Sequence, residues 1–268
     1  MINVKRELHL VQGGDFPYIQ IPKLNQIEGF FHMFTTRNGG YSQGPYASFN
    51  LSFASGDSLE SVTANKNLLS QFFGKQVIFP KQIHGNNIVI LDDYSERINA
   101  SLPADGLISN LKGGCIGVLT ADCLPLILVA PEKKCVALVH AGWRSSFGGI
   151  AKKAVDMLKA RFGANPRSIL VGIGPCIRVC CYEVGAELAD FVKQRFPDQN
   201  ELVIPGNGTV RVFLDLVKFN LLTLFEEGVS PENTFDCNLC TYCQQDLFFS
   251  HRAQRGPTGR QAAVAMWR

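Results

Sequence analysis

The chain has 268 residues, of which 46% are hydrophobic and 18% are charged, and its 26 basic and 23 acidic residues give a net charge of +3. A chain of this length can bury a large core without disulfides or a structural metal, and this balance of charge argues against a nucleic-acid partner. The first ten residues lack the apolar segment of a secretory signal, and no apolar run approaches the roughly 20 residues that span a bilayer, so we expect a soluble, cytoplasmic protein.

The predicted elements, in chain order, start with a loop-rich segment over 22–56 and a helix over 58–73, whose apolar residues recur at helical spacing. Short apolar runs predict strands at 77–79, 88–91, 115–119, 124–130, 135–140 and 169–173, and the unbroken hydrophobicity of the central ones indicates strands covered on both faces. Further helices are predicted over 149–162, 183–196 and 214–227, because Gly or Pro follows each pattern. The predicted fold class is α/β (α+β), a mixed-sheet sandwich with outer helices in a single domain over 1–268.

The runs 124–130 and 135–140 are joined by Pro-Glu-Lys-Lys, which predicts a hairpin with a four-residue loop. If the strands pair symmetrically about that loop, His140 lies opposite Pro125, and Cys123 lies opposite Gly142. Cys123 and His140 are then diagonal neighbours on one face, about 7–8 Å apart at the backbone. This separation allows a thiolate and an imidazole to bind one ion, although a slip of one residue would separate them.

His84 is the third candidate ligand, because it lies in a polar turn between two predicted strands. Ligands of type His, Cys and His leave a fourth position for water or substrate, which is typical of catalytic zinc. Such a metal lowers the pKa of bound water or polarises a substrate oxygen. From spacing alone, His84 could also be a surface histidine and His140 a satisfied core histidine, so both interpretations stay open at this stage.

The nine cysteines are odd in number and accompany no export signal, so a disulfide framework is not expected. Cys115 and Cys135 lie in predicted strands and are expected to be buried. A Cys-x2-Cys-x2-Cys array over 237–243 looks like a ligand set for structural zinc or an iron–sulfur cluster. It supplies only three thiolates, and the next cysteine is far away in the sequence at Cys181, so a metal site there is not favoured.

Three segments are candidates for anion binding, of which Gly172–Ile177 offers a glycine-containing backbone that leads toward a predicted helix. Thr35–Gly40 offers the cation of Arg37 together with flexible backbone donors, but it matches no known phosphate loop. Four arginines over 252–268 form either a solvated face or a small anion site, because the guanidinium fork suits phosphate and carboxylate.

Several sequence blocks, in a fixed order and over almost the whole chain, resemble those of the bacterial purine nucleoside phosphorylase family once called laccase-domain or multicopper polyphenol oxidase proteins, in its Gram-positive branch. The blocks are TTRNGGYSQGPYASFNL (35–51), KQIHG (81–85), ADGLIS (104–109), TADCLPL (120–126), VALVHAGWR (136–144), GPCIRVCCYEVG (174–185), CTYCQQDLFFSHR (240–252) and TGRQAA (258–263). The departures from the family's pattern fall at Ser145, Arg178 and His251.

The resemblance implies that His84, Cys123 and His140 bind the metal and carry catalysis, because they occupy the family's ligand positions. It implies an α/β sandwich with zinc or copper at the site. The implied reaction is phosphorolysis of adenosine, inosine, guanosine and methylthioadenosine, with adenosine deamination beside it. The three departures leave these ligands untouched and bear on substrate preference.

The favoured hypothesis is therefore a metal-dependent purine nucleoside phosphorylase with accessory adenosine deaminase activity, in which Arg37 contacts phosphate. The chain lacks the motifs of the cytidine-type deaminase site, and Asp122 and Glu183 are weak candidates for the general base of any deamination. The alternatives are a copper-dependent polyphenol oxidase, for which five histidines are few, a cysteine hydrolase that uses Cys123 and a histidine, and a non-enzymatic module. The expected partners are nucleosides and phosphate, without nucleic acid or membrane, and the oligomeric state is left open.

Overall fold

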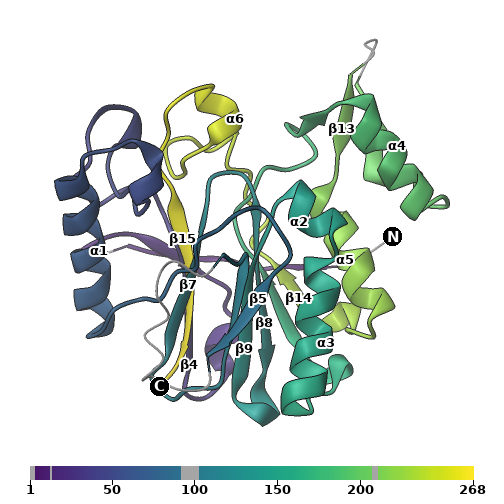
Figure 1. Cartoon of the computed structure of the whole chain (residues 1–268), viewed down its shortest axis with the longest axis horizontal. Coiled ribbons are helices and arrows are strands. Elements are labelled where there is room, and N and C mark those ends of the chain that lie inside the picture. The colour runs from purple at the N-terminus through teal and green to yellow at the C-terminus, as the bar shows by residue number, and fades with distance from the viewer. Residues whose placement is uncertain (1–3, 13, 92–102, 207–210) are drawn as a thin grey trace.

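The computed structural model describes residues 4–12, 14–91, 103–206 and 211–268. These residues form two large sheets packed face to face, with helices on both outer sides, as Figure 1 shows. The predicted α/β class, a mixed-sheet sandwich with outer helices, is therefore confirmed.

Three sheets are present among the described residues. The largest is mixed and runs in the order β1 (Lys5–Arg6), β14 (Thr234–Asp236), β10 (Leu170–Ile173), β8 (Leu124–Ala130), β9 (Cys135–Ala141), β6 (Gly106–Ser109) and β5 (Ile88–Leu91). The second is antiparallel and runs in the order β2 (His9–Val11), β3 (Tyr18–Gln20), β4 (Phe30–Thr35), β15 (Gln261–Trp267) and β7 (Cys115–Thr120). The smallest consists of β11 (Glu183–Val184), β13 (Val212–Leu214) and β12 (Val203–Pro205).

The helices within these ranges are α1 (Leu59–Phe73), α2 (Trp143–Phe147), α3 (Ile150–Phe162), α4 (Ala186–Arg195), α5 (Leu216–Glu226) and α6 (His251–Gln254). None of them has the length and hydrophobicity of a bilayer-spanning segment. In Figure 1, α1 covers the outer face of the five-stranded sheet, while α3 and α5 lie on the far side of the seven-stranded sheet.

Strand β8 shows how the layers are joined. Successive side chains of a strand point to opposite faces, so Leu126 and Leu128 pack in the core shared with α3 and α5. Ile127 and Val129 pack in the core between the two large sheets. Every residue of β8 and β9 is buried, which confirms the prediction of central strands covered on both faces.

The β8–β9 hairpin has the register that the sequence predicts. His140 lies opposite Pro125, and Leu124 lies opposite Ala141. The connection begins with a 3-10 turn over Pro131–Lys133, and Lys134 closes it in the left-handed region at φ 46°. The register matters because it places the position before β8 beside the end of β9.

Two element predictions need correction. Residues 77–79 form no strand, and only Ile78 makes an isolated bridge, to Ile116, because Pro80 lacks the N–H that a longer ladder would need. The helix predicted over 183–196 begins only at Ala186, since Glu183–Val184 pair with β13 instead. Cys115 and Cys135, as predicted, are buried in strands.

Candidate metal centre

The structure brings His84, Cys123 and His140 together. One ligand atom from each lies within 4.8 Å of those from the other two, and the two imidazole centroids are 4.9 Å apart. His84 comes from the turn before β5, Cys123 directly precedes β8, and His140 lies near the end of β9. Three segments that are distant in the sequence therefore present one nitrogen, one sulfur and one nitrogen at a single point.

The turn that carries His84 is fixed by the carboxylate of Asp105, which is fully buried. The backbone N–H groups of Ile83, His84 and Gly85 all donate to this carboxylate, at 3.2, 2.9 and 2.6 Å. His84 itself has a left-handed backbone, with φ 58°, which is uncommon for a residue with a side chain. The buried carboxylate thus holds the turn in the conformation that directs His84 to the site.

The same carboxylate orients His140. Its Oδ1 lies 2.9 Å from Nδ1 of His140, whose side chain is almost fully buried. An imidazole that donates its Nδ1–H to a carboxylate keeps Nε2 as the free ligand atom, and such a contact fixes the ring of a metal-binding histidine. Asp105 was not predicted as a site residue, although the Ala-Asp-Gly that precedes a buried strand places a carboxylate where only a paired one is tolerated.

Cys123 is positioned by its neighbour Asp122, which has φ 90°. The hydroxyl groups of Thr241 and Ser250 donate to Asp122 Oδ1 at 2.7 and 2.6 Å, and the backbone N–H of Arg252 donates to Oδ2 at 2.7 Å. These three bonds hold the strained turn before β8. They also occupy the carboxylate that the sequence offered as a weak general base, so the geometry favours a positioning role for Asp122.

Gly142 leaves the room that the site needs. A Cβ at this position would lie 3.0 Å from Cys123 Sγ and 3.6 Å from His84 Cδ2. The backbone of Gly142 is extended, with φ −70°, so its conformation would suit any residue. Glycine is therefore needed here for space and not for conformation, because Gly142 lies opposite Cys123 and a side chain would crowd its sulfur.

The Cys123 thiolate and the His140 imidazolium stabilise each other's charge. Burial raises the pKa of the Cys123 thiol, but the adjacent imidazolium of His140 and hydrogen bonds from both histidines outweigh it and lower the pKa to about 6. Burial lowers the pKa of His140, whereas the Cys123 thiolate and Asp105 raise it to about 9. A thiolate beside a histidine held by a carboxylate is a donor set that attracts a divalent cation.

Tyr182 interacts electrostatically with the Cys123 thiolate and with two arginines. The guanidinium of Arg252 lies 5.3 Å from the ring of Tyr182 and donates to the backbone oxygen of Glu183 at 2.7 Å. Burial raises the pKa of the Tyr182 hydroxyl, and the Cys123 thiolate adds to this, while Arg252 and Arg144 oppose it. Tyr182 thus lies within electrostatic range of both the thiolate and these two guanidinium groups.

Arg37 and Glu183 have contacts of their own. Arg37 donates from Nε to the oxygen of Ala47 at 2.8 Å and from Nη1 to that of Gln245 at 2.9 Å, and its guanidinium stacks 4.7 Å above the ring of Phe249. The carboxylate of Glu183 lies 3.7 Å from Arg211 Nε. Arg37 is thus used at least in part to fasten the loop after β4 to the segment before α6.

The donor set fits a single zinc ion with an open position. Zinc binds imidazole nitrogen at about 2.0–2.1 Å and thiolate sulfur at about 2.3 Å, and catalytic sites keep three protein ligands. The three ligand atoms are close enough to share one ion. His84 is exposed and Cys123 is half-buried, so the site opens to solvent on their side. Cu²⁺ also accepts imidazole and thiolate, and the donor types do not separate the two metals.

Known proteins resemble the chain along most of its length. The family described as multi-copper polyphenol oxidoreductase laccase matches residues 31–268. Purine nucleoside phosphorylase YlmD of Geobacillus stearothermophilus is 35% identical over 239 residues, which cover 85% of this chain and 87% of that protein. An adenosine deaminase of an unknown prokaryotic organism is 32% identical over 254 residues, which cover 90% of this chain and 97% of that protein.

The fold agrees with solved structures. The crystal structure of YlmD from Geobacillus stearothermophilus has a TM-score of 0.87 and 33% identity, with 97% of this chain and 98% of that chain covered. A Bacillus licheniformis hypothetical protein, YfiH, has the same TM-score at 30% identity. The resemblance inferred from the sequence blocks is thereby confirmed. Curated proteins similar to the chain include purine nucleoside phosphorylases. The chain belongs to the multi-copper polyphenol oxidoreductase laccase family.

Proposed function

We propose that the chain is a metal-dependent purine nucleoside phosphorylase whose ligands are His84, Cys123 and His140. The observation that carries the proposal is the meeting of these three side chains at one partly open point. In phosphorolysis a phosphate oxygen forms a bond to C1′ of the ribose, the glycosidic bond breaks, and the purine leaves with a proton in place of that bond. The proposed substrates are adenosine, inosine, guanosine and methylthioadenosine. The products are the free base and ribose 1-phosphate, or 5-methylthioribose 1-phosphate in the case of methylthioadenosine.

Residues around the candidate metal centre hold its ligands in the orientation that metal binding requires. His84, Cys123 and His140 would hold the proposed zinc ion, which would supply Lewis acidity to the reaction when bound. Asp105 holds His140 and the His84 turn through four hydrogen bonds, so the donor set needs little rearrangement when an ion arrives. Such preorganisation lowers the cost of charge development at the reacting centre.

Phosphate requires cationic or N–H donors near the metal. Arg37 is the contact proposed from the sequence, and its two bonds to backbone oxygens leave part of the guanidinium fork for an anion. Arg144 and Arg252 are further candidates, because both act electrostatically on Tyr182 beside Cys123.

Adenosine deamination is proposed as a second reaction of the same site, in which water replaces the amino group to give inosine and ammonia. Its support is the curated relative that carries this name and matches 90% of the chain. The site that positions a phosphate oxygen for one reaction would position a water oxygen for the other.

The proposed location is the cytoplasm, where nine free cysteines remain reduced.

A cysteine hydrolase is the second candidate, because the low pKa of Cys123 beside His140 also suits a nucleophile. A copper-dependent polyphenol oxidase has less support. The chain has five histidines, and among the described residues two of them meet at the candidate centre, whereas a multicopper site needs many more.

Product analysis of adenosine turnover tests the proposal. Purified protein is assayed for metal content and incubated with adenosine, with and without phosphate. We expect adenine and ribose 1-phosphate only with phosphate, and inosine in either case. His84→Ala should lose the metal of the candidate centre and both activities, while His9→Ala, which changes an exposed histidine in β2, should retain them.

Each alternative function predicts a different outcome in this assay. Full activity in His84→Ala would refute the ligand set. Activity that survives chelation and is blocked by a thiol reagent favours the hydrolase. Several coppers for each chain, together with oxidation of a phenol, favour the oxidase.

A further inference from the structure

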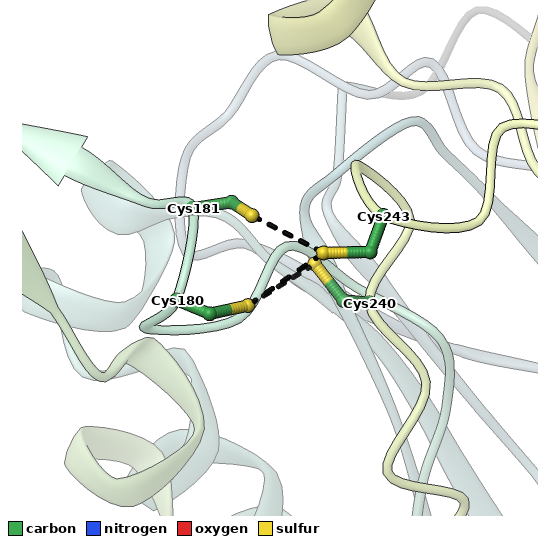
Figure 2. A group of neighbouring side chains, drawn as sticks. All are labelled: Cys180, Cys181, Cys240 and Cys243. Carbon is green, nitrogen blue, oxygen red and sulfur yellow. Dashed lines mark hydrogen bonds between the residues drawn. The ribbon is translucent and has the colours of Figure 1, made fainter.

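A second group of potential metal ligands lies outside the candidate metal centre. The side chains of Cys180, Cys181, Cys240 and Cys243 place their sulfurs within 4.8 Å of one another. Figure 2 shows that they come from two segments, with one pair on each, and that the sulfurs point toward a common centre. The first pair lies between β10 and β11, and the second follows β14.

The structure corrects the sequence-based view of these cysteines. The array over 237–243 lacked a fourth thiolate, and the adjacent pair at 180–181 lies about sixty residues earlier. Folding brings that pair to the array, whereas Cys237 is buried elsewhere and takes no part in the group. Four ligands are therefore present, and they form one Cys-Cys and one Cys-x2-Cys unit.

The distances between the sulfurs suit one tetrahedral ion. Ligands at about 2.3 Å from zinc in tetrahedral geometry are about 3.8 Å from one another. The sulfur of Cys180 lies 3.7 Å from that of Cys240 and 3.9 Å from that of Cys243, and Cys181 and Cys243 are 3.3 Å apart. An iron–sulfur cluster occupies more space than one ion and would hold its sulfurs further apart.

Backbone contacts hold the two segments in register. Cys176 forms a bridge with Cys240, in which the N–H of Cys176 donates to the oxygen of Leu239 at 3.3 Å and the N–H of Thr241 donates to the oxygen of Cys176 at 3.0 Å. The position of each cysteine pair is thus set by main-chain bonds, and the group is not a chance meeting of mobile side chains.

We propose that Cys180, Cys181, Cys240 and Cys243 form a structural zinc site, separate from the candidate metal centre and closed by four thiolates. Four protein ligands leave no open position, which distinguishes a structural site from a catalytic one. The divalent ion displaces the thiol protons when it binds. The proposal does not depend on which reaction the chain catalyses.

An ion bound by the four cysteines would stabilise two segments that contact residues of the candidate metal centre. Thr241, next to Cys240, donates to Asp122, and Tyr182, next to Cys181, lies beside Arg252. An ion that joins the two cysteine pairs therefore joins two segments that border the site. We expect loss of the ion to make these two segments more mobile under conditions in which the sheets remain folded.

The number of bound zinc ions tests the proposal. Protein purified under reducing conditions with zinc, and then dialysed, is compared as His84→Ala alone and as His84→Ala combined with Cys243→Ser. Cys243 is exposed, so its replacement should not prevent folding. We expect one zinc for each His84→Ala chain and none when Cys243→Ser is added. His84→Ala combined with Cys237→Ala is the matched control, because Cys237 belongs to the sequence array but not to the group, and it should keep its zinc.

Cobalt substitution gives a second readout that is independent of activity. Co²⁺ in four thiolates produces an intense sulfur-to-metal absorption band with tetrahedral visible bands. Both should be present in His84→Ala and in its Cys237→Ala control, and absent with Cys243→Ser. Equal zinc in the Cys243→Ser and Cys237→Ala proteins would overturn the proposal. So would an iron–sulfur cluster, or disulfides among these four cysteines in protein prepared without oxygen.

Discussion

Asp105 connects more parts of the candidate metal centre than any ligand does. Its carboxylate accepts three N–H groups from the turn of His84 and contacts Nδ1 of His140. A fully buried residue thereby sets the position of two of the three candidate ligands. The sequence indicated the ligands because hairpin counting places Cys123 beside His140. It did not indicate Asp105, whose partners lie about 20 and 35 residues away.

Replacing Asp105 with Asn should weaken metal binding by about 10- to 100-fold, because the amide no longer fixes the free nitrogen of His140 and presents a donor to the turn. Zinc affinity is measured by competition with a chromophoric chelator. Asp156→Asn, which changes an exposed carboxylate of α3, is the control and should bind as the unaltered protein does. Equal affinity in the two variants would show that Asp105 is not needed.

The affinity for zinc should rise with pH. Without the ion, His140 is protonated below its raised pKa of about 9, and Cys123 is a thiolate above its lowered pKa of about 6. Between these values binding displaces one proton, from His140, so the affinity should increase about tenfold for each pH unit. Below the pKa of Cys123 the thiol proton is displaced as well and the slope becomes steeper, whereas above the pKa of His140 the contribution of its proton disappears. Competition titrations across this range check the slopes, and a flat profile between pH 7 and 8 would contradict the assignment.

At the scale of elements, α1 does more than cover a sheet. Leu69 packs in the core of the five-stranded sheet, while Asn65, one turn earlier, is fully buried and points to the loop after β4. Its side-chain amide donates to Ser42 Oγ and to the backbone oxygens of Ser48 and Asn50, at 2.8 to 3.1 Å, and its Oδ1 accepts from the N–H of Tyr41 at 2.8 Å. The helix thereby holds the loop that contains Arg37.

Asn65→Ala should lower the free energy of unfolding by about 2–4 kcal/mol, because it leaves buried backbone groups of that loop without partners. Asn67→Ala, two residues further along the same helix, changes an exposed side chain and should be neutral or slightly stabilising. Urea unfolding of both variants measures the difference. Equal midpoints would show that the loop does not depend on the helix.

The elements that the sequence predicted well are those with a strong local pattern. The helices α1 and α3 and the strands β8 and β9 lie within one or two residues of their predicted bounds, because apolar periodicity and Gly stops set them. The strand β11 was missed, because two residues that extend a helical pattern pair with β13 for reasons of tertiary packing. The four-cysteine group was missed for the same kind of reason, since its fourth ligand depends on a long-range contact.

At the scale of the whole molecule, the last strand joins segments from opposite parts of the chain. β15 lies between β4 and β7 in the five-stranded sheet, and every one of its residues is buried. In Figure 1 this C-terminal strand, drawn in yellow, runs through the middle of the molecule beside β7. The sheet is therefore complete only after residues 261–267 have been made.

Removal of residues 261–268 should abolish folding. The lost side chains include Val264, Met266 and Trp267, and the exposed edges of β4 and β7 would add to a loss that exceeds the roughly 5–15 kcal/mol stability of a domain. Arg268→Ala keeps the strand and should remain folded. Soluble yield and circular dichroism distinguish the two, and a folded truncated protein would contradict the role of β15.

The tight connection between β8 and β9 has a practical consequence. Glu132 in this loop is exposed, and seven residues of strand separate it from the ligand end of the hairpin, which is about 23 Å of extended chain. A fluorophore attached there should leave the ligands undisturbed, while the rigid ladder ties the label to any movement of the two strands. The far tip of the hairpin is thus a place where the protein can be labelled or immobilised while its candidate ligands stay accessible to metal.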